Sequence, residues 1–145
     1  MSIEKFKIIE QLDDTANREA FLRLPRVEFL LEQLDRRLKG GVGKMVTNPQ
    51  MELTDRFSMT VPDNRMADVG ICKGDYVVIQ RRKKYLEGDV LAVRLGERVF
   101  IRRYFRSANR IRLECGTPDR QTMILDTDTP GFSILGNVVQ VIREL

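Results

Sequence analysis

The spacing of apolar residues changes near Gly40, where a helical period gives way to short alternating runs. Upstream of Gly40, the apolar positions follow the three- and four-residue spacing of one helix face, Val27, Leu30, Leu31, Leu34 and Leu38. Pro25 suits the first turn of this helix, and Gly40-Gly41 predicts its end.

Two shorter helices are predicted upstream of this one. The first is indicated by apolar residues at helical spacing, Phe6, Ile9 and Leu12. A second helix, with Asp14 or Thr15 as its N-cap, is predicted to run through Ala20, Phe21 and Leu24. Residues 1–44 are therefore predicted to form a short all-α N-terminal segment.

Downstream of Gly43, apolar and β-branched runs alternate with turn residues. The predicted strands are 56–61, 75–80, 89–95, 98–105, 110–115, 122–125 and 134–142. Gly-Asp, Gly-Glu and Pro-Gly pairs separate them. Many short strands in so few residues indicate a mainly β barrel or sandwich-like domain over residues 45–145.

Composition narrows the chemistry that this domain can support. The chain of 145 residues has no histidine and only two cysteines, Cys72 and Cys115. Histidine-dependent nucleophilic sites are thereby excluded, and a zinc site would lack ligands, so we expect no cofactor. We favour two reduced thiols over a disulfide, and a net charge of +4 permits contact with nucleic acid without requiring it.

No apolar run approaches the length of a membrane span, and Met1 to Lys5 lack the apolar stretch of a secretory signal. We therefore expect a cytoplasmic protein with no membrane contact.

Three segments of the β region resemble the LexA/UmuD family of self-cleaving repressors and polymerase accessory proteins. The first runs from Phe57-Ser58-Met59 through Asp63-Asn64-Arg65-Met66 to Gly70-Ile71 and Gly74-Asp75. The second runs from Gly88-Asp89 through Gly96-Glu97 to Ile101-Arg102-Arg103, and the third is the final apolar run, 134–143. The resemblance implies a curved antiparallel β-fold that dimerises, often through its C-terminal strand.

The two positions that carry the family's chemistry differ in this chain. The family uses a serine nucleophile and a neutral lysine base. Arg65 occupies the serine position when the sequences are matched through Met66, and Arg102 occupies the lysine position when they are matched through Gly96-Glu97. A guanidinium is neither a nucleophile nor a base, so we predict no peptidase activity from this dyad.

Two alternatives for the altered cleft stay open. The two arginines can bind an acidic group, from Asp63, a partner or a nucleotide, or they can both extend into solvent, which we favour. A relocated dyad using Ser58 with another lysine would make the chain an active peptidase, which we consider a minor alternative.

Two further groups of residues are candidates for binding. Basic residues with interleaved aromatics form a possible nucleic-acid or anion surface: Arg81, Arg82, Lys83, Lys84, Arg103 and Arg106. Strand alternation places Arg102 and Arg106 on one face and Arg103 on the other, which favours a solvated surface instead. The apolar stripe from Val27 to Leu38 is predicted to pack against the β-domain, a second copy or another protein.

The leading hypothesis is a catalytically inactive regulator, of the kind that the resemblance links to DNA damage or a prophage. It would dimerise through its β-domain and use the N-terminal segment, residues 1–44, for association or for minimal DNA binding. The alternative is a UmuD-like accessory protein that binds a translesion polymerase or a recombinase.

Overall fold

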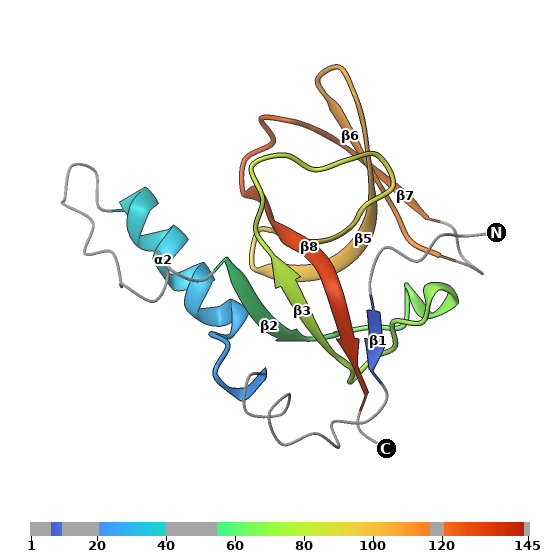
Figure 1. Ribbon diagram of the computed structural model, residues 1–145. Helices are drawn as coiled ribbons and strands as arrows, with labels where there is room; N and C mark the ends of the chain where they lie inside the picture. The colour runs from blue at the N-terminus through green and yellow to red at the C-terminus, as the bar shows by residue number, and fades with distance from the viewer. Residues whose placement is uncertain (1–6, 10–20, 40–54, 117–120, 144–145) are drawn as a thin grey trace.

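The computed structural model describes residues 7–9, 21–39, 55–116 and 121–143. One curved, largely antiparallel sheet dominates these ranges, with helix α2 (Val27–Lys39) beside it and a 3-10 turn η1 (Ala67–Val69) (Figure 1). The strands are β1 (Lys7–Ile9), β2 (Arg56–Thr60), β3 (Tyr76–Gln80), β4 (Val90–Leu95), β5 (Arg98–Ser107), β6 (Arg110–Glu114), β7 (Thr122–Asp126) and β8 (Phe132–Ile142).

All seven strands predicted downstream of Gly43 are present, with bounds shifted by at most two residues. Their order in the sheet is β2-β3-β8-β4-β5-β6-β7, and β1 pairs with β8 in parallel. The prediction of a mainly β-fold is therefore confirmed.

Strand β8 lies at the centre of the sheet and makes it bend. It pairs with β4 along its first half and with β3 along its second half. The register shifts once against each neighbour, which leaves Leu135 and Val139 as extra residues. Such bulges increase local twist and bend the strand, which matches the curved path of β8 in Figure 1.

Gly136 lies beside the first of these shifts because the chain comes too close there for a side chain. A Cβ at this position would lie 2.8 Å from the carbonyl oxygen of Gln80. The absence of a side chain lets β8 cross the end of β3.

Both faces of the sheet are covered near its centre, and each covered face has its own apolar core. Strand β4 contributes to both cores, because Val90 and Ala92 enter one while Leu91 and Val93 enter the other. This explains why β4 reads as a continuous apolar run and not as an alternating one.

The predicted helix ending at Gly40 is present as α2, and it packs beside β2. Val27 and Leu30 are buried in the core of the β-domain, and Leu31 and Leu34 pack against that core. The stripe therefore packs against the β-domain, one of its three expected partners. The side chain of Leu38 lies outside the described residues.

The prediction of a helix around Ile9 is wrong. Lys7–Ile9 form β1, which pairs in register with Gln140, Val141 and Ile142 of β8. Two adjacent β-branched residues, Ile8 and Ile9, favour an extended backbone, and the open edge of β8 supplies the hydrogen bonds. The helix predicted from Asp14 lies outside the described residues over most of its length.

Candidate functional site

Arg65 and Arg102 occupy the positions that the resemblance assigns to the dyad. Both contact the carboxylate of Asp63, Arg65 through its backbone N–H and Arg102 through its side chain. Arg65 lies in the turn before η1, and Arg102 lies in β5. Asp63 accepts a hydrogen bond from the backbone N–H of Arg65 through Oδ1, at 3.0 Å. Its other oxygen, Oδ2, lies 3.6 Å from Nη2 of Arg102. Asp63 therefore connects the two positions.

Arg102 is largely buried beside Asp63. Its side chain is only 12% exposed. Nη1 donates a hydrogen bond to the backbone carbonyl of Ile101, and the guanidinium lies 4.8 Å from the centre of the Phe100 ring. The favoured expectation, in which both arginines extend into solvent, is therefore wrong for Arg102, because an acid, a carbonyl and an aromatic face compensate its burial.

Three contacts hold the turn that carries Arg65 in place. The side chain of Met66 is 2% exposed and packs into the apolar core. Asn64 accepts a hydrogen bond from the backbone N–H of Lys73, and the carbonyl of Arg65 accepts one from Gly116. The backbone that would present a nucleophile is therefore well ordered, although its side chain is an arginine.

The residues proposed for a relocated dyad do not come together. Ser58 is 4% exposed in the middle of β2, and its backbone N–H donates to the carbonyl of Pro25. Lys73, Lys83 and Lys84 are exposed and lack the burial that makes a lysine a base. The described geometry thus gives Ser58 neither access to a peptide bond nor a basic partner.

The six basic residues proposed from the sequence as a binding surface do not all line the same hollow in the structure. Lys83, Lys84 and Arg106 line one hollow. The guanidinium of Arg82 instead donates to Oδ1 of the buried Asn137, at 2.8 Å.

Alternation along β5 is confirmed by ring contacts. Arg98 and Arg102 both lie over Phe100, which places their side chains on one face of the strand. Arg103 pairs with Glu114 of β6 in the strand register, on the other face, and Arg81 is half-buried.

Asp75 and Arg143 form an ion pair next to the end of β8, and no local sequence pattern predicted it. Asp75 is 5% exposed and accepts two hydrogen bonds from Arg143, at 3.0 and 2.9 Å. Burial raises the pKa of the Asp75 carboxyl, but the hydrogen bonds from Arg143 and the N–H of Cys72, with the charge of Arg143, together hold it below its ordinary value of 3.8.

The described residues show no grouping of three or more side chains suited to a metal ion. Cys72 and Cys115 are free thiols. Among the described residues there is also no helix with the length and apolar character that crossing a membrane requires.

Comparison with known proteins gives one family. A family model described as Peptidase S24-like matches residues 39–139. The LexA repressor of Dechloromonas aromatica (strain RCB) is 34% identical over 87 residues, which are 60% of this chain and 43% of that protein. The LexA repressor of Leptothrix cholodnii is 33% identical, over 60% of this chain and 38% of the relative.

A third relative, with lower sequence identity, is also a LexA repressor. The LexA repressor of Clostridium tetani is 30% identical over 88 residues, which are 61% of this chain and 42% of that protein. The chain therefore matches about two fifths of the length of these curated relatives.

Proposed function

Because the chain belongs to the Peptidase S24-like family, we propose that it is a catalytically inactive member that acts as a LexA-like regulatory protein. It dimerises through its β-domain and controls gene expression by contact with DNA or with a protein partner. The relatives described above are LexA repressors, which supports a regulatory role.

The observation that carries the proposal is the environment of Arg102. A lysine base in this family must lose its proton, whereas Arg102 is a permanent cation beside Asp63 at 3.6 Å. The carboxylate would also hold a lysine at this position in its charged form. Both the residue and its neighbour therefore oppose base catalysis, and Arg65 supplies no hydroxyl.

The regulatory role is tested with the full chain by light scattering and by gel shift. We expect the mass of a dimer, and tighter binding to a duplex from the gene's own promoter region than to a random duplex of equal length. A monomer without promoter preference would contradict the proposal and favour an accessory protein that binds a polymerase or recombinase.

A further inference from the structure

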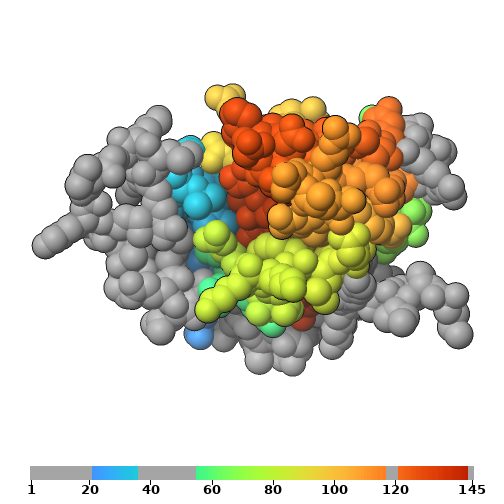
Figure 2. Space-filling view, turned by 90° about the horizontal axis from the view of Figure 1, so that it is seen from above, coloured from blue at the N-terminus to red at the C-terminus, as the bar shows by residue number. Residues whose placement is uncertain are grey.

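The loop between β3 and β4, residues 81–88, and the end of β5 line two hollows, which open on opposite faces of β5 because Tyr104 lines one and Phe105 the other. The larger has a volume of about 590 Å³ and is lined by the loop, Tyr104 and Arg106. The smaller, of about 230 Å³, lies on the face of β5, β6 and β7 that carries Phe105, Arg112 and Ile124. Glu87 and Arg106 line both. Figure 2 looks onto this side, with the loop in yellow-green beside the β5–β6 hairpin in orange.

Positive charge predominates around the hollows. Lys83, Lys84 and Arg106 line the larger one, and Arg110 and Arg112 line the smaller one. Arg112 pairs with Glu114 at 2.9 Å, but none of the other four forms an ion pair with an acid of the described residues.

One acid, Glu87, lines both hollows. The Glu87 carboxylate accepts a hydrogen bond from the backbone N–H of Arg106, at 2.7 Å. The side chain of Arg106 donates instead to the carbonyl of Ala108. The surface therefore attracts anions.

The loop that bears the lysines is preorganised. The hydroxyl of Tyr85 accepts a hydrogen bond from the backbone N–H of Arg82, and Asp89 accepts one from Leu86. The N–H of Gly88 donates to the carbonyl of Tyr104 on β5. Lys83 and Lys84 are thus displayed from a fixed backbone, which lowers the entropy lost on binding.

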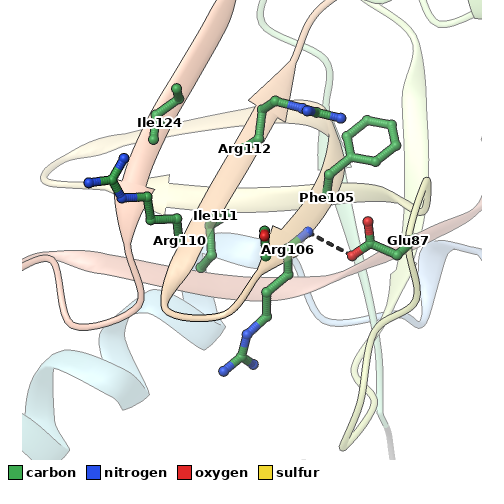
Figure 3. Close-up of a pocket in the computed structure, with 8 residues that line it drawn as sticks. Glu87, Phe105, Arg106, Arg110, Ile111, Arg112 and Ile124 are labelled. Carbon is green, nitrogen blue, oxygen red and sulfur yellow. Dashed lines mark hydrogen bonds between the residues drawn. The ribbon is translucent and has the colours of Figure 1, made fainter.

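Planar and apolar groups form the inner surfaces of both hollows. Tyr85 and the 61% exposed Leu86 line the larger one. In the smaller one, the guanidinium of Arg112 lies 4.5 Å from the centre of the Phe105 ring, and Ile124 is 62% exposed (Figure 3). A cation stacked on a ring is itself a platform on which a nucleobase can stack.

We propose that these two hollows bind single-stranded nucleic acid. Lys83, Lys84 and Arg106 contact phosphates, while bases enter the hollows against Tyr85 and the Phe105–Arg112 stack. Flat π-faces beside a cationic groove are the general means of holding a single strand without reading its sequence. A duplex presents stacked bases that cannot enter a hollow, and an acidic peptide would leave the planar groups unused.

The test measures fluorescence anisotropy of labelled oligothymidine with the full chain between about 50 and about 200 mM salt. We expect the Lys83→Ser, Lys84→Ser, Arg106→Ser variant to bind about tenfold more weakly or worse at the lower salt concentration. Its slope of log affinity against log salt should be about 2 units shallower, as three lost phosphate contacts require.

A matched control removes three exposed cations that line neither hollow, Arg23→Ser, Lys73→Ser and Arg98→Ser, the last at the opposite end of β5 from Arg106. Both variants lower the net charge equally, so the control should retain the wild-type affinity within about twofold if the hollows and not the overall charge bind the strand. Circular dichroism checks that both variants are folded.

Three results would overturn the proposal: absence of binding by the wild type, equal weakening in both variants, or tighter binding of a labelled duplex or an oligoglutamate peptide than of oligothymidine. The proposal is independent of the regulatory function, because promoter preference and single-strand affinity are measured on different probes.

Discussion

At the scale of single residues, Asp63 connects Arg65 and Arg102, the two positions that the resemblance assigns to the dyad. One of its oxygens holds the Arg65 turn and the other faces Arg102. The resemblance assigned both arginines to the dyad positions, because Met66 and Gly96-Glu97 set its register. The sequence left open whether Asp63, a partner or a nucleotide faces the arginines, since the contact depends on how the turn folds onto β5.

Asp63 also determines what would be needed to rebuild a dyad. The Arg65→Ser, Arg102→Lys variant should remain inert, because the carboxylate keeps the introduced lysine protonated. Adding Asp63→Asn preserves an acceptor for the Arg65 N–H and removes the charge, and labelling by a serine-directed fluorophosphonate should then rise about 100-fold or more.

The control for this series carries Arg102→Met in place of Arg102→Lys and should stay unlabelled. Equal labelling of the variants with and without Asp63→Asn would show that Asp63 has no such influence.

The Asp75–Arg143 pair predicts how stability depends on pH. The pKa of Asp75 is lowered on folding, so the unfolded chain binds the proton more readily and acid favours unfolding. The contribution is complete above the ordinary value of 3.8 and disappears as pH falls through the lowered pKa. At neutral pH, Asp75→Asn should reduce the free energy of unfolding by about 1 to 3 kcal/mol, measured by urea denaturation.

The difference between wild type and Asp75→Asn should narrow as the pH is lowered below 3.8. A difference that stays constant across that range would show that the carboxylate charge does not stabilise the fold. The sequence could not predict the Asp75–Arg143 pair, because the two residues are 68 positions apart.

At the scale of elements, periodicity predicted what depends on local pattern and missed what depends on distant pairing. The strands after Gly43 and helix α2 repeat their apolar positions often enough to be recognised. Strand β1 has only three residues and is defined by pairing with β8 at the other end of the sequence. Its local signal, the adjacent Ile8 and Ile9, is too short to separate a strand from a helix turn.

Helix α2 is predicted to unfold together with the sheet. Leu30 is 0% exposed in the core of the β-domain, and Asp35 binds Arg94 of β4 through two hydrogen bonds. Leu30→Ala should therefore lower the free energy of unfolding by about 2 to 5 kcal/mol, within a single urea transition.

The matched control for α2 is Leu22→Ala, at a side chain that is 71% exposed, with an expected change below about 0.5 kcal/mol. Two results would show that α2 unfolds independently of the sheet. One is a separate early unfolding transition in Leu30→Ala, and the other is an unchanged free energy of unfolding.

At the scale of the whole molecule, a Peptidase S24-like fold holds Arg65 and Arg102 at the positions that the resemblance assigns to the dyad. The ordered turn, the curved β8 and the two cores are features of a stable scaffold, and none of them requires a nucleophile. Such a scaffold can present surfaces, including the basic hollows beside β5, without acting on a peptide bond.

Intact-mass spectrometry of the purified wild-type chain during prolonged incubation at alkaline pH tests the absence of peptidase activity most directly. Alkaline conditions would deprotonate any lysine base and so favour a relocated dyad. We predict a single unchanged mass throughout the time course. Two complementary fragments that accumulate at a rate independent of protein concentration would contradict the account, because they would show self-cleavage within one chain.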